Sequence, residues 1–121
     1  MKILIVDDST VVRTVVRQAL DEGGYLDVCE AEDGLQALDE ARKTGEGIGL
    51  YVLDVNMPRM DGITLVGAIR KFDKNTPIIM LTTETDKEKM VEAKALGATG
   101  WIVKPFDAPK FLDVVRLLAK K

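Results

Sequence analysis

The sequence of 121 residues contains no histidine and only one cysteine. Without histidine, the chain cannot supply Ser-His-Asp or Cys-His catalysis, nor a histidine-ligated zinc site. Because Cys29 is alone, it cannot form an internal disulfide, and we interpret it as a small buried apolar residue. Any chemistry of this chain must therefore come from carboxylates, hydroxyls and lysines.

Long apolar runs and excess positive charge are also missing. Every apolar run is far shorter than a membrane span, and residues 1–3 lead directly into a predicted strand, without a signal peptide. The net charge of −3 and the pI of about 5.0 argue against sequence-independent binding of nucleic acids. We therefore expect one cytoplasmic, monomeric domain over residues 1–121, with neither nucleic-acid nor membrane partners.

Five short apolar runs predict strands, because four to eight apolar residues bounded by turn signals are typical of buried strands. They are residues 3–6, 26–31, 50–53, 78–81 and 100–103. Helical spacing of apolar residues predicts helices at 10–22, 35–44, 63–72, 87–96 and 108–118. The expected helix caps are Asp86 and Asp107, and the expected buried positions include Leu35, Phe72, Leu96 and Leu118.

This alternation indicates the fold class. Strands that alternate with helices through short loops form a parallel sheet covered on both faces, with right-handed crossovers. The flavodoxin-like strand order 2-1-3-4-5 fits five such units. We therefore predict a doubly wound α/β fold with five strands and five flanking helices.

Polar residues follow four of the predicted strands. The run at 50–53 ends on Asp54, which by itself fits a turn residue as well as an active carboxylate. The carboxyl ends of strands 1, 3, 4 and 5 share one edge of the sheet. The polar residues at these ends are Asp7, Asp8, Asp54, Thr82 and Lys104.

These residue types together indicate phosphoryl transfer. Two carboxylates about 4 Å apart repel by about 4 kcal/mol at an effective dielectric near 20, so three stay ionised only beside a cation. An ion that prefers a few carboxylates and water is Mg²⁺ or Mn²⁺. Lys104 and Thr82 suit a phosphoryl oxygen. Asp54 is the expected nucleophile, because it ends a central strand alone while Asp7 and Asp8 hold the metal.

With this site assembled, four motifs resemble the receiver domain of bacterial two-component response regulators. They are VDDS at 6–9, DVNMPRMDG at 54–62, LTTE at 81–84 and GWIVKPF at 100–106, in family order over essentially the whole chain. Among receivers, the chain is most similar to single-domain, CheY-like chemotaxis regulators. The resemblance implies that Asp54 accepts a phosphoryl group from a histidine of a sensor kinase.

The resemblance also implies roles for the other site residues. Mg²⁺ would be held by Asp7, Asp8, Asp54 and the backbone carbonyl of Asn56. Lys104 would pair with the phosphoryl oxygens, and the Lys104–Pro105 peptide would be cis.

Further residues are implied to switch or tune the protein. Thr82 would hydrogen-bond the phosphorylated aspartate and Trp101 would follow it inward, which repacks the face of helix 4, strand 5 and helix 5. Asn56 and Glu84 would tune slow self-dephosphorylation. Thr83 stands where the family usually has a small residue, and Trp101 stands where it usually has Tyr or Phe. Trp101 also fits plain strand packing.

The implied partners are a sensor histidine kinase, a downstream protein such as a flagellar motor switch, and a phosphatase. A single-domain phosphorelay intermediate is an alternative, and so, in another class, is a small aspartyl-phosphate phosphatase, although no substrate-binding insertion is visible. A flavodoxin-like cofactor carrier is disfavoured because Asp7 and Asp8 would repel a phosphate. We expect a signalling switch rather than an enzyme.

Overall fold

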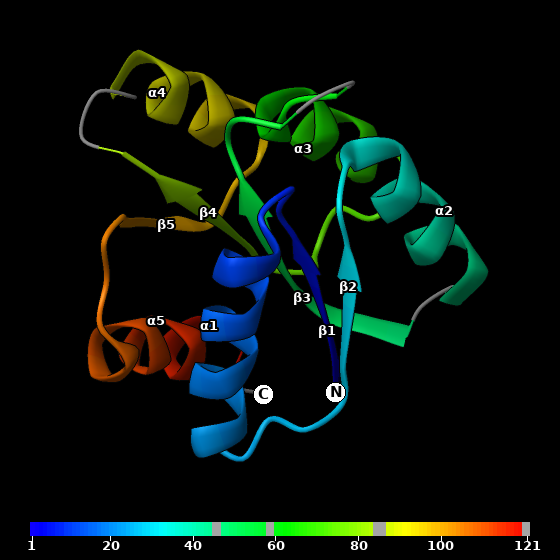
Figure 1. Cartoon of the computed structure of the whole chain (residues 1–121). Helices are drawn as coiled ribbons and strands as arrows, with labels where there is room; N and C mark the ends of the chain where they lie inside the picture. The colour runs from blue at the N-terminus through cyan, green and yellow to red at the C-terminus, as the bar shows by residue number, and fades with distance from the viewer. Residues whose placement is uncertain (45–46, 58–59, 84–86, 120–121) are drawn as a thin grey trace.

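Five parallel strands form the centre of the computed structural model, which describes residues 1–44, 47–57, 60–83 and 87–119 (Figure 1). The strands are β1 (Lys2–Val6), β2 (Val28–Ala31), β3 (Ile48–Asp54), β4 (Ile78–Thr82) and β5 (Gly100–Val103). Their order is β2-β1-β3-β4-β5, which confirms the predicted topology. The register pairs Val6 with Leu53, Asp54 with Leu81, and Thr82 with Val103, so the strands end at one common edge.

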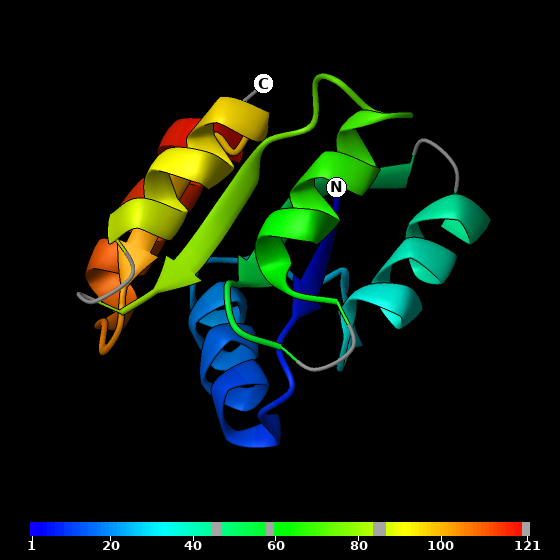
Figure 2. The ribbon, with the colours of Figure 1, turned by 90° about the horizontal axis from the view of Figure 1, so that it is seen from above.

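Five helices cover the two faces of this sheet. They are α1 (Thr10–Glu22), α2 (Gly34–Thr44), α3 (Gly62–Arg70), α4 (Lys87–Leu96) and α5 (Ala108–Ala119). Helices α1 and α5 lie on one face, and α2, α3 and α4 lie on the other (Figures 1 and 2). This arrangement is the predicted doubly wound α/β fold.

The central strands are buried on both faces because both faces carry helices. Along β1, Leu4 and Val6 belong to the core under α2, α3 and α4, whereas Ile3 and Ile5 belong to the core under α1 and α5. Alternate side chains of a strand point to opposite faces, so a continuous aliphatic run is required.

None of the described helices is long and apolar enough to cross a membrane.

Several predicted core positions prove to be exposed. On α2, the expected core positions Leu38 and Ala41 are buried, but Leu35 is 52% exposed, because Ala37 completes the buried stripe in its place. Phe72 is 45% exposed, since α3 already ends at Arg70 and the helical spacing does not extend to it.

Other expectations fail at the ends of elements. Strand β2 begins at Val28, which leaves Leu26 70% exposed. Leu96 is 42% exposed at the last residue of α4. Leu118 and Cys29, which were predicted to be buried, are only partly buried. In α5, the fully buried Phe111 is a core residue that was not predicted.

The predicted caps are partly confirmed. Asp107 accepts a hydrogen bond from the Lys110 amide at 2.8 Å at the start of α5. The Ser9 hydroxyl caps α1 by accepting from the Val12 amide at 3.2 Å, which was not foreseen. The predicted cap Asp86 lies outside the described residues.

Candidate functional site

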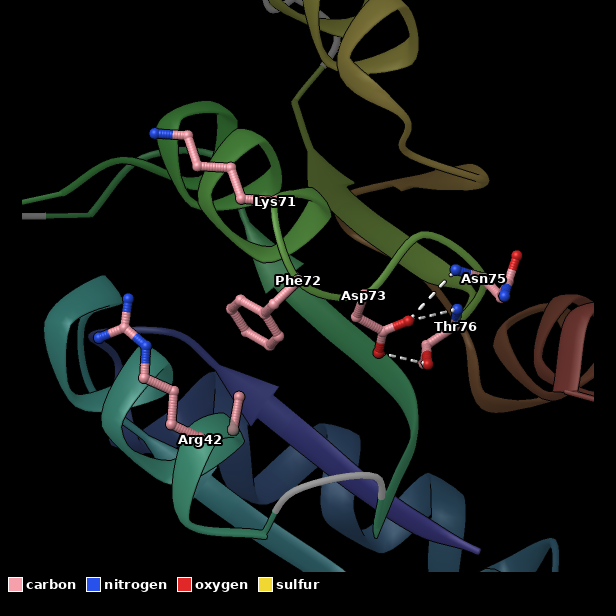
Figure 3. A pocket seen from close by; sticks show the side chains of 7 residues that line it. Arg42, Lys71, Phe72, Asp73, Asn75 and Thr76 are labelled. Atoms are coloured by element: carbon pink, nitrogen blue, oxygen red, sulfur yellow. Dashed lines mark hydrogen bonds between the residues drawn. The ribbon is translucent and has the colours of Figure 1, made fainter.

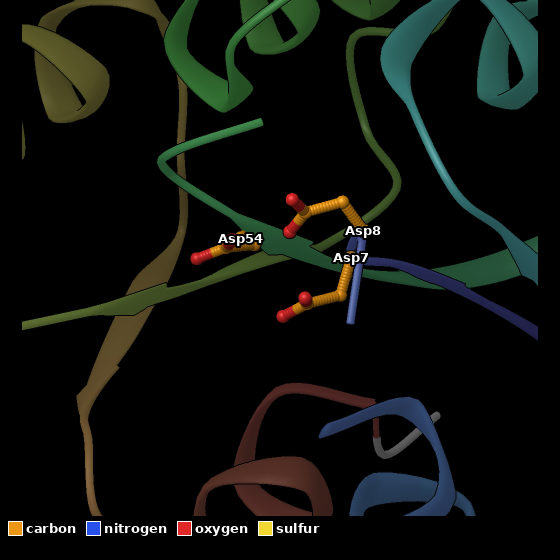
Figure 4. Close-up of side chains that lie close together, drawn as sticks. All are labelled: Asp7, Asp8 and Asp54. Atoms are coloured by element: carbon orange, nitrogen blue, oxygen red, sulfur yellow. The ribbon is translucent and has the colours of Figure 1, made fainter. Parts of the chain in front are cut away.

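Three carboxylates meet where the first and third strands end. Asp54 is the last residue of β3, and Asp7 and Asp8 directly follow β1, its neighbour in the sheet. One carboxylate oxygen from each lies within 4.8 Å of the others (Figure 4). Asp7 and Asp54 are buried, and Asp8 is exposed. The structure therefore brings together the three acidic residues that the sequence analysis singled out.

Lys104 joins this cluster from the end of β5. Its Nζ lies 2.9 Å from Asp54 Oδ1 and 3.6 Å from Asp7 Oδ2. The Lys104 amide donates to the carbonyl of Thr82 at the end of β4, which fixes the start of the loop. The Lys104–Pro105 peptide is cis, the isomer that the resemblance implies. A single ammonium group thus contacts both buried carboxylates.

One lysine does not offset the negative charge of this cluster. Burial raises the pKa of Asp7, and the charge of Asp54 raises it further, against a lowering hydrogen bond from the Ser9 amide. Burial also raises the pKa of Asp54, although the hydrogen bond from Lys104 lowers it. Burial lowers the pKa of Lys104, but its hydrogen bond to Asp54 and the charges of Asp54 and Asp7 outweigh this effect and raise it overall.

The cluster fits a hard divalent cation. Asp7 Oδ2 is buried and accepts no hydrogen bond from the described residues, although Lys104 Nζ lies 3.6 Å away. A buried carboxylate oxygen without a donor is unfavourable, and a metal ion would satisfy it. The three carboxylates offer only oxygen ligands, which are the ligands that Mg²⁺, Mn²⁺ and Ca²⁺ prefer.

Two residues that shape the site were missed from the sequence. A Cβ at Gly62 would lie 2.2 Å from the carbonyl oxygen of Asp54, so only glycine lets the start of α3 approach the end of β3 this closely. Arg13 donates through Nη1 to the carbonyl of Asp7 and through Nε to Glu30 at 2.9 Å. Gly62 looked like loop punctuation and Arg13 like a surface position of a helix.

Thr82 ends β4 and is buried, at the same edge as the carboxylates. Its hydroxyl donates to Met90 Sδ at 3.7 Å, so here it is directed toward α4. Trp101 on β5 is 37% exposed, and the ammonium of Lys94 lies 6.0 Å from its ring centroid. The predicted tuning residue Glu84 lies outside the described residues.

Asn56 lies two residues after Asp54, and its side chain has a partner that the sequence did not reveal. Lys89 of α4 donates from Nζ to Asn56 Oδ1 at 2.8 Å, between residues 33 positions apart. In the sequence, Lys89 is one of several charged residues in the segment 87–96, and no pattern distinguishes it from the others.

A hollow of about 780 Å³ lies at the opposite edge of the sheet, where α2 and α3 end (Figure 3). Asp73 there accepts hydrogen bonds from the Asn75 amide, the Thr76 amide and the Thr76 hydroxyl, at 3.2, 3.0 and 2.6 Å. The guanidinium of Arg42 lies 6.0 Å from the ring centroid of Phe72. Asp73 thus holds the turn between α3 and β4 and takes no part in the carboxylate cluster.

Comparison with known proteins identifies the family to which the chain belongs. A sequence model described as the response regulator receiver domain matches residues 3–116. The chain belongs to this family. A Campylobacter jejuni protein named as a chemotaxis protein CheY homolog is 42% identical over 108 residues, covering 88% of this chain and 82% of that protein. The Treponema pallidum chemotaxis protein CheY is 34% identical over 119 residues, or 98% of this chain and 83% of that protein.

Solved receiver structures have the same architecture. The Vibrio cholerae chemotaxis protein CheY4 superposes with a TM-score of 0.87 at 45% identity, over 97% of each chain. The receiver domain of NtrX from Brucella abortus superposes with a TM-score of 0.90 at 29% identity, over 98% of each chain. The protein is therefore a two-component response regulator built on the receiver fold.

Proposed function

We propose that this receiver domain accepts a phosphoryl group on Asp54 from a histidine of a sensor kinase, and that Mg²⁺ is required. The observation that carries the proposal is the position of Lys104 Nζ, 2.9 Å from the buried Asp54 and 3.6 Å from the buried Asp7, whose Oδ2 accepts no hydrogen bond from the part of the chain that the structure describes. The carboxylates of this site favour an added cation, and the ammonium of Lys104 favours a bound anion. Phosphoryl transfer requires both.

In the proposed step, a carboxylate oxygen of Asp54 forms a bond to phosphorus while the bond between phosphorus and the donor imidazole nitrogen breaks. Lys104 would hold a phosphoryl oxygen as charge builds there. Asp7, Asp8 and Asp54 would hold the metal, with the backbone carbonyl of Asn56 as a further ligand. Bound Mg²⁺, or Mn²⁺ in its place, would neutralise the carboxylates and the transferred oxygens.

Phosphorylation is proposed to change the face formed by α4, β5 and α5. Thr82 would exchange its contact with Met90 for a phosphoryl oxygen, and Trp101 would move inward behind it. The present arrangement supplies the starting state, since Thr82 is buried beside α4 and Trp101 is partly exposed. The protein then acts as a binary switch with slow self-dephosphorylation, to which Asn56 and Glu84 would contribute, rather than as an enzyme with an external substrate.

The names of the relatives favour chemotaxis as the pathway. The proposed partners are accordingly a chemotaxis histidine kinase, a target such as the flagellar motor switch, and a phosphatase. A groove of about 460 Å³ beside Lys104, lined by Val11, Val12, Val15, Thr83, Pro105 and Phe106, adjoins the site. Its mostly apolar lining is suited to the surface of the kinase that presents the histidine.

Uptake of label from a radioactive small-molecule phosphodonor tests the proposal. The wild-type protein should incorporate acid-stable, base-labile label in the presence of Mg²⁺ and none in EDTA, and Asp54→Asn should incorporate none. Asp61→Asn is a matched control, because Asp61 caps α3 outside the carboxylate cluster and asparagine caps equally well. Equal uptake by Asp54→Asn would refute the assignment, and steady turnover of an organic phosphate would indicate a phosphatase instead.

A further inference from the structure

The hydrogen bond between Lys89 and Asn56 joins α4 to the loop that follows the phosphoacceptor. Lys89 is the third residue of α4, and its neighbour Met90 receives the hydroxyl of Thr82 at 3.7 Å. Two consecutive residues of one helix thus contact two different segments of the site edge. The contact with Asn56 is the shorter, at 2.8 Å from Nζ to Oδ1.

The chemistry of the two groups fixes which end of the Asn56 amide is used. An ammonium group donates hydrogen bonds and accepts none, so the atom that faces it must be the carbonyl oxygen Oδ1. The NH₂ group of Asn56 can only donate. While Lys89 is bound, the best hydrogen-bond acceptor of this side chain is therefore engaged.

Placing a lysine here opposes the local electrostatics of the helix. The amino-terminal end of a helix carries partial positive charge, and a lysine in its first turn is unfavourable. The Lys89 ammonium is exposed and contacts a neutral amide, and no carboxylate among the described residues pairs with it to compensate for this position. The presence of a lysine at residue 89 is better explained by its hydrogen bond to Asn56.

We infer that Lys89 is a positioning residue that slows hydrolysis of the phosphorylated Asp54 by occupying Asn56 Oδ1. This inference rests on the proposed phosphorylation of Asp54. Hydrolysis requires a water oxygen to attack phosphorus while the bond from phosphorus to the Asp54 oxygen breaks. Asp54 leaves as a carboxylate, and the protons of the water pass to the inorganic phosphate that is released. An acceptor beside the site orients such a water and receives its hydrogen bond. The amide oxygen of Asn56 can accept two hydrogen bonds, but the contact with Lys89 holds Oδ1 toward α4 and weakens it as an acceptor for a water at Asp54, so Asn56 serves this purpose best when Oδ1 is released.

The size of the effect follows from the exposure of the hydrogen bond. An exposed hydrogen bond of ordinary strength is formed in roughly 70 to 85% of molecules. Oδ1 is then free in roughly 15 to 30% of molecules, so removing the Lys89 ammonium raises this free fraction by about three- to six-fold. Lys89→Met should accelerate loss of the phosphoryl group by this factor, while the rate of uptake from a small phosphodonor stays within about two-fold, since the uptake step does not use Oδ1.

The experiment measures both rates on the purified full chain with Mg²⁺, using labelled phosphodonor for uptake and removal of the donor for decay. Lys87→Met is the matched control, because it removes the same charge from the same end of α4 and leaves the bond between Lys89 and Asn56 intact. Lys89→Arg should restore slow decay, because arginine also donates to Oδ1.

A double-mutant cycle separates this role from a general effect of charge or folding. In an Asn56→Ala background, Lys89→Met should leave the decay rate unchanged, because no Oδ1 remains to be released. The inference is overturned if Lys89→Met decays like wild type, if Lys87→Met decays equally fast, or if the acceleration persists without Asn56. Failure of wild type to take up label would instead refute the proposed phosphorylation, and uptake is measured first.

Discussion

Replacing Asp7 by asparagine should stabilise the protein without metal and destabilise it, relative to wild type, when Mg²⁺ is abundant. Asparagine has the shape of aspartate and keeps an oxygen to accept from the Ser9 amide, now at 2.8 Å from Asp7 Oδ1. It removes a buried negative charge whose Oδ2 accepts no hydrogen bond from any described residue. The substitution therefore isolates the charge of one carboxylate.

The charge–charge interactions of Asp7 almost cancel. The charge of Asp54, within 4.8 Å, repels that of Asp7 by about 3.5 kcal/mol at an effective dielectric of about 20. Lys104, at 3.6 Å, attracts it by about 4.6 kcal/mol on the same basis. The exposed Asp8 adds roughly 1 kcal/mol of repulsion, since solvent screens it.

The remaining effect is the burial of the carboxylate. Burying an ion costs several kcal/mol, and the hydrogen bond from Ser9 returns roughly 1.5 to 3 kcal/mol of this. We expect Asp7→Asn to raise the free energy of unfolding by about 2 kcal/mol at pH 7 in EDTA. Because the pKa of Asp7 is raised in the folded state, this penalty is absent below its unfolded pKa and appears as pH rises through its folded pKa.

Magnesium should reverse the order of stability. An ion that binds only the native state at one hundred times its Kd adds about 2.7 kcal/mol to the free energy of unfolding. Wild type should gain this amount, and Asp7→Asn much less, because it has lost one of three charged ligands. Urea unfolding followed by fluorescence of the single tryptophan, Trp101, measures both proteins in EDTA and along a Mg²⁺ series.

Asp61→Asn controls for the chemical change, and its stability relative to wild type should be independent of Mg²⁺, because Asp61 lies outside the cluster. The reasoning is refuted if Asp7→Asn is less stable than wild type in EDTA. It is refuted equally if the difference between the two proteins stays constant along the Mg²⁺ series.

Three further predictions concern the scaffold and use denaturant unfolding. Gly62→Ala should lower the free energy of unfolding by about 2 kcal/mol or more, because its Cβ would lie 2.2 Å from the Asp54 carbonyl oxygen. Gly67→Ala, whose Cβ would have its nearest atom at 3.9 Å, should be neutral or stabilise the protein. Equal effects of the two substitutions would contradict the clash at Gly62. Phe111→Ala should cost about 3 to 5 kcal/mol since Phe111 is fully buried, and Phe72→Ala, at 45% exposure, much less. The pKa of Asp73 is lowered, because hydrogen bonds from Thr76 and Asn75 outweigh its burial. Its contribution to the free energy of unfolding should therefore be present above its unfolded pKa and disappear as pH falls through its folded pKa. A difference in stability between wild type and Asp73→Asn that does not vary over the acid range would contradict this.

The sequence by itself determined the fold class and the composition of the site. Continuous aliphatic runs such as 78–81 must be buried on both sides, which requires a parallel sheet with helices on both faces. Once the strands are parallel, residues that follow them share one edge, so Asp7, Asp54 and Lys104 could be grouped before any distance was known.

Only the tertiary structure decided which helix positions are buried and which side chains meet across the loops. Leu35 and Phe72 have the right residue type for the core, but the direction of each helix over the sheet and the residue at which it ends leave them exposed. The contact between Lys89 and Asn56 joins residues 33 positions apart through the placement of α4. Local spacing carries no information about such contacts, because they depend on how separate elements are positioned by the whole core.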